Sequence, residues 1–178
     1  LVISEESAFL MTSMLKDVVS ASGGTGSAAR LDRPVAGKTG TTSDWKDAWF
    51  CGYTPNTVGV VWLGFDQNKT MQQWRITGGS YPALIWGRMM KEITANESPS
   101  DFPVPSSVVS CKICKRTGEL PSPACPESDI VTEYFPKDKV PTTMCTYPHG
   151  NANLEALDVD PEETPDPEDE VPAEPGGF

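Results

Sequence analysis

The sequence predicts an α/β domain in which two helices flank a three-stranded antiparallel sheet, followed by a small cysteine-rich β unit and an acidic tail. Two segments with apolar residues at helical spacing indicate the helices. Between them lie three strand-like segments, and the loops that connect these are short enough for hairpins. Proline becomes frequent after Ser98, where 14 of the 17 prolines lie, so a domain boundary is expected near that point.

The first helix is predicted over residues 4–20. Ser4 is the expected N-cap, and Glu5 and Glu6 suit the first turn because the helix dipole favours acidic groups there. The glycine-rich stretch Gly23-Gly24-Thr25-Gly26 then ends the helix. The apolar stripe predicted to face the core consists of Met11, Met14, Leu15, Val18 and Val19.

Strands are predicted over residues 34–42, 48–53 and 58–65, joined as an antiparallel meander. The third strand is almost entirely apolar, which is typical of a strand that is covered on both faces. Cys51, in the apolar second strand, is expected to be a buried and inert thiol.

The second helix is predicted over residues 81–96, with Pro82 in its first turn. Its apolar face is expected to pack on the sheet. The residues of this face are Ala83, Leu84, Trp86, Met90 and Ile93.

This pattern divides the chain into four parts. Residues 1–96 form the first domain, and residues 97–107 form a linker with three prolines. Residues 108–150 form a small cysteine-rich module with strands expected at 108–109 and 130–135. Residues 151–178 contain ten acidic residues and no Lys or Arg, which predicts a disordered spacer. The other 150 residues carry 15 acidic and 14 basic residues, a balance that argues against a nucleic-acid surface.

The four cysteines of the module are Cys111, Cys114, Cys125 and Cys145. An even number of cysteines in a short, loop-rich segment favours disulfides and an oxidising compartment, with the connectivity left open. The alternative is zinc held by these residues and His149. We favour disulfides because a zinc ribbon usually repeats the Cys-x-x-Cys pair, whereas Cys125 has no such neighbour.

The stretch Val35-Ala36-Gly37-Lys38-Thr39-Gly40-Thr41-Thr42 begins like a strand and then combines a cation, hydroxyl groups and glycines. Glycine within a strand often marks the close approach of a ligand or another backbone. Lys38 supplies a positive charge with three donors, and the threonines supply hydroxyl groups. This combination predicts a strand that lines a cleft for an anionic, peptide-like ligand.

Together with Gly24-Thr25-Gly26, Asp47-Ala48-Trp49-Phe50 and Gly52-Tyr53-Thr54-Pro55, this stretch resembles the class A penicillin-binding proteins, the bifunctional cell-wall synthases of bacteria. The resemblance covers about residues 1–96. It implies the C-terminal portion of a transpeptidase domain with the penicillin-binding protein and serine β-lactamase fold. Residues 114–145 resemble the C-terminal extension of many Gram-positive members.

The resemblance implies a serine-type peptidoglycan D,D-transpeptidase that cross-links stem peptides, is acylated by β-lactams and needs no cofactor for this reaction. By the same resemblance, Thr41 contributes its backbone N–H to the oxyanion hole. The residues expected to bind the substrate and its terminal carboxylate are Lys38, Thr39, Gly40, Thr41 and Thr42.

The family has three active-site motifs, and only Lys-Thr-Gly is clearly present. Ser13-Met14-Leu15-Lys16 spells Ser-x-x-Lys, but Ser13 lies 25 residues before Lys38, whereas the family separates these motifs by a much longer stretch. Met14 and Leu15 also belong to the predicted packing stripe, and no Ser-x-Asn occurs in the sequence. The nucleophilic serine is therefore expected on an N-terminal part of the same protein, present as a separate chain.

The resemblance further implies a full-length protein that is also a glycosyltransferase. It would lie on the extracytoplasmic face of the membrane, anchored by an N-terminal transmembrane segment that this chain lacks; the start Leu-Val-Ile-Ser suggests a fragment. One alternative is a D,D-carboxypeptidase or β-lactamase-type hydrolase, against which the context of residues 47–55 argues. Another is a non-catalytic wall-binding module in which residues 108–150 are the working part.

Overall fold

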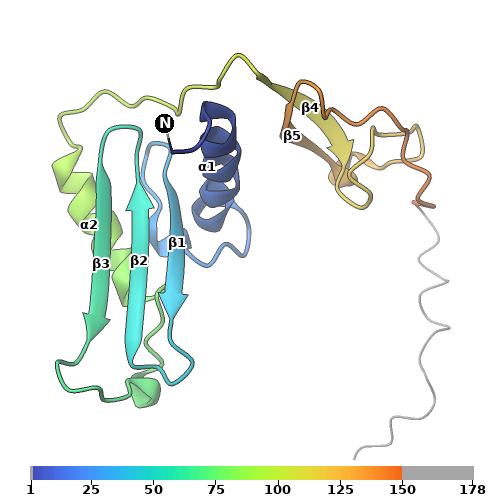
Figure 1. Ribbon diagram of the computed structural model, residues 1–178. Helices are drawn as coiled ribbons and strands as arrows, with labels where there is room; N and C mark the ends of the chain where they lie inside the picture. Colours follow the sequence, from blue (N-terminus) through green and yellow to red (C-terminus); the bar gives the residue numbers. More distant parts are fainter. Residues whose placement is uncertain (1, 150–178) are drawn as a thin grey trace, which may run out of the picture.

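The computed structural model describes residues 2–149, so the predicted acidic spacer at 151–178 lies outside the described residues. Two helices and three strands come first, and two further strands follow (Figure 1). In order they are α1 (Glu5–Ser20), β1 (Ala36–Thr41), β2 (Asp47–Tyr53), β3 (Val58–Gly64), α2 (Tyr81–Ile93), β4 (Val108–Cys114) and β5 (Ile130–Pro136). Short 3-10 helices lie at Ser27–Ala29, Gln72–Trp74 and Glu127–Asp129. No helix within residues 2–149 is long and apolar enough to span a membrane.

The first three strands form an antiparallel sheet in the order β1-β2-β3. The helix α1 packs against β1, while α2 packs against β2 and β3. Both helices lie on one face of the sheet (Figure 1). The predicted α/β fold with an antiparallel sheet and packed helices is therefore confirmed.

The core lies between this face and the helices, around Phe50 and Trp86, which are fully buried. Their rings meet edge-on with centroids 5.3 Å apart, and the Trp86 indole N–H donates to the Gly59 carbonyl oxygen at 2.9 Å. Burying such a side chain contributes about 1.5–3 kcal/mol. A Cβ at Gly52 would come within 2.7 Å of the Phe50 ring, so this position has no room for a side chain.

The start of α1 agrees with the prediction, because the Ser4 hydroxyl accepts the Ser7 N–H and two acidic residues occupy the first turn. Its buried face agrees only in part: Val19 is buried as predicted, and Leu15 and Val18 are half-buried. Thr12 and Val19 are buried, whereas Met11 and Met14 are 51% and 58% exposed. The prediction was right for Val19 but wrong for these two methionines, because the sheet strand that α1 packs against is the edge strand β1, which covers only part of the predicted stripe.

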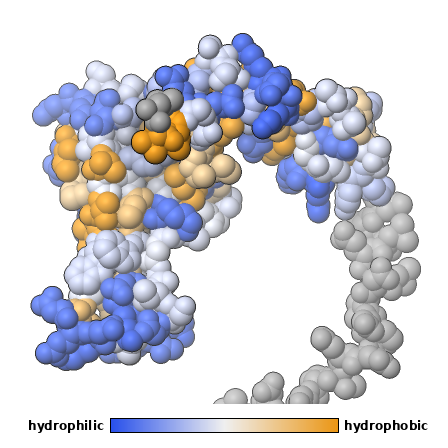
Figure 2. All heavy atoms as spheres, viewed as in Figure 1, coloured by the Kyte–Doolittle hydropathy of each residue, from blue (hydrophilic) through white to orange (hydrophobic). Residues whose placement is uncertain are grey.

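The third strand and Cys51 also depart from the prediction. Cys51 is exposed, and so are alternate residues of β3: Val58, Val60 and Trp62. Side chains alternate between the two faces of a strand, so Phe50 in the core forces Cys51 onto the opposite, outer face. No element among the described residues covers that face, and Figure 2 shows hydrophobic side chains exposed on it.

Helix α2 begins as predicted, with Pro82 in its first turn, but it ends at Ile93 rather than Asn96. Its buried residues include Ala83, Trp86 and Met90 as predicted. The two outer members of the predicted face, Leu84 and Ile93, are 37% and 52% exposed. The sheet contacts a narrower stripe of this helix than its apolar residues suggest.

The second unit is built on the antiparallel pair β4 and β5, and β4 extends to Cys114, well beyond the two residues predicted. It is joined to the first unit by contacts of side chains. The Phe9 ring of α1 meets the Tyr134 ring of β5 at 5.0 Å, and the Lys16 ammonium lies 3.0 Å from the Asp101 carboxylate. The Tyr53 and Phe102 rings meet at 5.5 Å, so the connecting segment follows the surface of the first unit.

Candidate functional site

The strand β1 lies at an edge of its sheet, because among the described residues it pairs with β2 only. An edge strand offers unpaired N–H and C=O groups to a further strand. The Thr42 N–H bonds to the Asp47 carbonyl oxygen across the hairpin, at 3.1 Å. Because neighbouring residues in an antiparallel ladder point their backbone groups to opposite edges, the Thr41 N–H points away from β2, toward the free edge.

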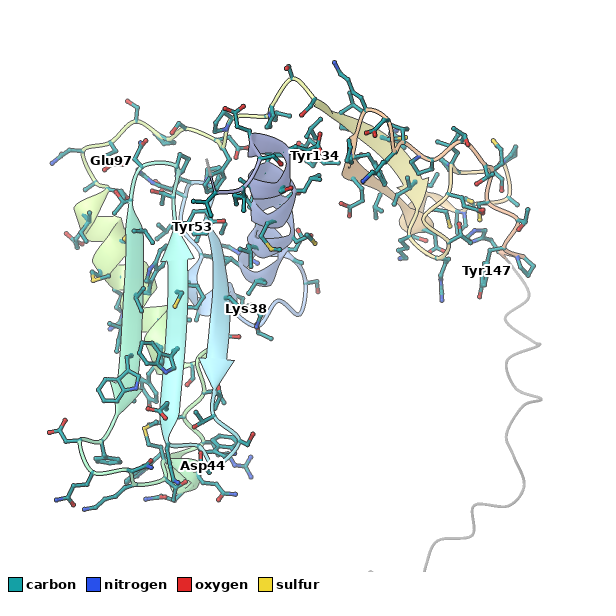
Figure 3. All side chains as sticks on the ribbon, viewed as in Figure 1. Lys38, Asp44, Tyr53, Glu97, Tyr134 and Tyr147 are labelled. Carbon is teal, nitrogen blue, oxygen red and sulfur yellow. The ribbon has the colours of Figure 1, made fainter. Side chains whose placement is uncertain are left out.

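The side chains of this strand divide between two faces. Lys38 and Gly40 stand opposite Cys51 and Trp49 in the register and therefore share the outer face. Thr39 and Thr41 lie on the other face, as expected for alternate residues. The exposed Lys38 ammonium donates to the Thr39 carbonyl oxygen at 3.0 Å, which brings its charge to the backbone of the strand (Figure 3).

The two threonine hydroxyls open onto a pocket of about 410 Å³. Its lining residues are Thr25, Thr39, Thr41, Thr77, Gly79 and Ser80. The hydroxyls of Thr25 and Thr39 are hydrogen bonded at 2.9 Å, and the Gly78 N–H donates to the Thr41 hydroxyl oxygen at 3.0 Å. The pocket is thus rich in hydroxyl groups that can bond to an anionic or amide ligand.

Sequence reasoning missed the loop at residues 77–80, although its run of Thr, Gly, Gly and Ser was a signal of the same kind as the strand itself. The loop needs its glycines for close packing. A Cβ at Gly78 would collide with the carbonyl oxygens of Trp49 and Gly40, and one at Gly79 with the Thr25 carbonyl oxygen. The glycines therefore let the loop lie directly against β1.

Gly40 is different, because a Cβ there would meet Trp49 Cβ at 3.4 Å, an ordinary contact. The fold of the described residues leaves room for a side chain at this position. A glycine that packing does not require, on an exposed edge strand, is consistent with close approach of a ligand backbone.

Thr42, the last of the predicted binding residues, has a clear role in the turn. Its hydroxyl oxygen accepts the N–H groups of Lys46 and Asp47, each at 3.0 Å. Trp45 has a φ of 57°, and its N–H donates to the Thr42 carbonyl oxygen. Thr42 thus shapes the hairpin between β1 and β2, and its contact with substrate stays a prediction.

The Ser-x-x-Lys segment lies on α1. Ser13 is half-buried, and the Lys16 ammonium is paired with Asp101 of the connecting segment at 3.0 Å. This pairing directs the lysine toward the linker. It agrees with the interpretation that this segment is not the catalytic motif.

The module contains a second cluster, formed by Cys114, Cys125, Cys145 and His149, whose ligand atoms all lie within 4.8 Å of one another. All five cysteines of the chain are free thiols in the structure, in contrast to the disulfides that we favoured. The Cys111 thiol takes no part in the cluster and contacts the Lys112 carbonyl oxygen at 3.5 Å.

The pKa values of Cys114, in this cluster, and of Asp129, beside it, are shifted. Burial raises the pKa of the Cys114 thiol, but hydrogen bonds from the backbone of Arg116 and Thr117 and from the neighbouring thiols outweigh it and lower this pKa to about 6. The Lys115 ammonium holds the pKa of the Asp129 carboxyl below its usual value.

Comparison with known proteins identifies the family. Residues 1–91, half of the chain, match the family model of the penicillin binding protein transpeptidase domain. The chain belongs to the penicillin-binding protein transpeptidase family. Residues 104–149 match a second model, the C-terminal domain of penicillin-binding protein 1A. The resemblance to class A penicillin-binding proteins is thereby confirmed.

Several individual proteins of this family are similar to the chain. Penicillin-binding protein 1A of Clostridium tetani is 35% identical over 85% of the chain and 20% of that protein. Penicillin-binding protein 1A of Pseudomonas aeruginosa is 35% identical over 84% of the chain and 18% of that protein. The crystal structure of penicillin-binding protein 1A from Haemophilus influenzae has a TM-score of 0.67 at 30% identity, over 81% of this chain and 22% of that one. The chain thus spans about a fifth of the length of these relatives.

Proposed function

We propose that this chain supplies the substrate-binding strand of a serine-type peptidoglycan D,D-transpeptidase that β-lactams acylate. The observation that carries the proposal is the free edge of β1, which presents Lys38, Thr39, Gly40 and Thr41 in a chain of the transpeptidase family. The relatives named above are penicillin-binding proteins, which supports the same reading.

The chemistry of the strand suits a peptide that ends in a carboxylate. A stem peptide or β-lactam can add to the free edge of β1 through backbone hydrogen bonds, as in β-augmentation. The Lys38 ammonium and the hydroxyls of Thr39 and Thr41 then attract and bond the carboxylate. Gly40 leaves space for the ligand backbone.

The reaction is acyl transfer, in which a serine attacks a carbonyl carbon and the carbonyl oxygen becomes an oxyanion. The Thr41 N–H is directed to the free edge, where it can donate to that oxyanion. A preorganised donor of this kind is worth about 2.7–4 kcal/mol of transition-state stabilisation.

The proposal places the nucleophilic serine on an N-terminal part of the same protein, which binds this chain to complete the active site. It extends to a full-length class A enzyme with a glycosyltransferase activity. Such an enzyme would be anchored at the extracytoplasmic face of the membrane through its N-terminal part.

Labelling with a fluorescent penicillin tests the proposal. The chain is incubated with the label alone and together with a separately produced N-terminal part that carries Ser-x-x-Lys and Ser-x-Asn. We expect label on the serine of the N-terminal part only in the mixture, and none on the isolated chain. Replacing Lys38 with Ala should reduce labelling, whereas the matched replacement of the exposed Lys69, outside the site, should not.

Label on the isolated chain, at Ser13 or elsewhere, would contradict the split site. Product analysis with an amine acceptor then separates the transpeptidase from a hydrolase. Hydrolysis without any cross-linked product would favour the D,D-carboxypeptidase or β-lactamase alternative.

A further inference from the structure

The module of β4 and β5 contains three thiols arranged around one imidazole. The Nε2 atom of His149 lies 3.3 Å from the Cys114 Sγ, 3.2 Å from the Cys125 Sγ and 3.3 Å from the Cys145 Sγ. In Figure 3 this cluster lies beside the labelled Tyr147, whose ring is 5.0 Å from that of His149. The three cysteines are buried, and the His149 side chain is 2% exposed.

These distances fit a tetrahedral metal site. Zinc binds thiolate sulfur at about 2.3 Å and imidazole nitrogen at about 2.0–2.1 Å, so the edge between a sulfur and the nitrogen of a tetrahedron is about 3.5 Å. The three observed edges are 3.2–3.3 Å. Three thiols and one imidazole, whose ligand atoms all lie within 4.8 Å of one another, are a donor set typical of a closed structural zinc site.

The backbone holds each ligand in place from a different segment. Cys114 ends β4 and begins a tight turn, in which the Gly118 N–H donates to the Cys114 carbonyl oxygen at 2.8 Å and Gly118 has a φ of 76°. The Ser122 N–H donates to the Cys125 Sγ at 3.3 Å. The Cys145 N–H donates to the Leu120 carbonyl oxygen at 2.7 Å. These bonds preorganise the cluster.

His149 is oriented by a buried carboxylate. Its Nδ1 atom lies 3.0 Å from the Asp129 Oδ2, and a proton on Nδ1 that is donated to Asp129 leaves the Nε2 lone pair directed at the three thiols. Asp129 is itself 8% exposed and lies 3.0 Å from the Lys115 ammonium. A carboxylate behind a histidine in this way is the usual outer partner of a metal ligand.

The cluster is also a large part of the small core of its module. The three buried cysteines pack against the partly buried Ile130 and Tyr147, and the other buried apolar residues of the module are Val108 and Ile113 of β4. So small a core provides little burial of apolar surface, and units of this size usually need disulfides or a metal for stability. A disulfide would join two of the three thiols and leave the third, with His149, buried beside it.

We propose that Cys114, Cys125, Cys145 and His149 bind one zinc ion in a closed site that orders the module. Binding converts three thiols to thiolates and releases their protons, and His149 binds as the neutral imidazole through Nε2. With no open coordination position the role is structural. The inference does not depend on the proposed transpeptidase function.

The first test is the metal content of the purified whole chain, measured by inductively coupled plasma mass spectrometry, together with thiol titration. We expect one zinc per chain, slow reaction of three thiols in the native protein, and reaction of all five after denaturation with a chelator. A chain without metal whose mass shows the loss of hydrogens through disulfides would overturn the proposal. A reduced chain that binds no zinc after incubation with the ion would also overturn it.

Variants with a matched control locate the site. Cys145→Ser and His149→Ala should lose the zinc, whereas Cys111→Ser, in the same module but outside the cluster, should keep it. Asp129→Asn should weaken zinc affinity about 10–100-fold, and the exposed Asp138→Asn should leave it unchanged. Zinc retained by the Cys145→Ser and His149→Ala variants would contradict the assignment.

Cobalt substitution gives a readout in the unaltered chain, in case the variants fail to fold. Cobalt(II) added to the reduced, metal-free chain should produce thiolate-to-cobalt charge-transfer bands and the visible bands of tetrahedral coordination, and zinc should abolish both. A spectrum of octahedral cobalt without thiolate bands would show that the cluster is not the ligand set.

Discussion

Thr41 combines two groups whose roles can be separated. Its hydroxyl faces the pocket and accepts the Gly78 N–H, whereas its backbone N–H points to the free edge of β1. The hydroxyl belongs to the side chain and can be removed by a substitution that keeps the backbone. The N–H can be removed by proline, which edge strands tolerate better than central strands.

Thr41→Pro should therefore reduce acylation by penicillin more than Thr41→Val does. Loss of an oxyanion donor lowers the rate about 10²–10³-fold, while loss of the hydroxyl removes one hydrogen bond, worth about 0.5–1.5 kcal/mol. The measurement is the rate of fluorescent penicillin labelling of the complex with the N-terminal part. Circular dichroism of both variants checks that the sheet is retained. Equal rates for the two variants would contradict the oxyanion role of this N–H.

The elements of the first unit position the site through close backbone contacts. The loop at residues 77–80 lies against β1 because Gly78 has no side chain, while Gly40 of β1 is open on its outer side. Glycine thus has a different structural role at each of these two positions. One serves packing within the chain, and the other leaves space for a ligand.

Replacing each glycine with alanine separates these reasons. Gly78→Ala should destabilise the fold by about 1–3 kcal/mol, because the new Cβ collides with backbone atoms that cannot move freely. Gly40→Ala should change stability by no more than about 0.5 kcal/mol. It should nevertheless slow penicillin labelling, by up to about 10²-fold, because the ligand is displaced from the strand.

Urea unfolding measures the stability and labelling of the complex measures the acylation. Gly40→Ala with normal labelling would show that no ligand lies close to this position. A stable Gly78→Ala variant would show that the loop can move away from β1 at little cost.

At the scale of the molecule, within residues 2–149, helices cover one face of the sheet and leave the other exposed. Trp49, Val60 and Trp62 on that face are 41–54% exposed, and Trp49 and Trp62 contact each other with ring centroids 6.0 Å apart. An exposed group of large apolar side chains on a sheet usually marks an interface. Under the proposed function, the N-terminal part that carries the nucleophilic serine would pack on this face.

We expect Cys51, on this same face, to react quickly with a thiol reagent in the isolated chain and slowly in the complex with the N-terminal part. Burial of the face would exclude the reagent. Mass spectrometry of the modified peptides gives the rate for each cysteine, and Cys111, in the separate module, serves as the reference. Unchanged reactivity of Cys51 would show that the complex leaves this face open.

Most of the secondary structure was predicted from patterns among neighbouring residues. The Ser4 cap, Pro82 at the start of α2 and the short loops between strands depend on neighbouring residues, so the order and type of these elements were predicted correctly. The exposure of Met11 and Cys51 was not predicted, because the burial of a face depends on which element packs against it. Only three-dimensional packing decides that.

The sequence by itself determined the meander of strands and the Lys-Thr-Gly motif on β1, since both depend on residues that are close together in the sequence. Tertiary structure decided that Lys38 lies on the uncovered face of the sheet and that the loop at residues 77–80 joins the pocket. It also gathered Cys114, Cys125, Cys145 and His149 and left Cys111 aside. These ligands are up to 35 residues apart in the chain, and only the turns of the folded backbone bring them to one point.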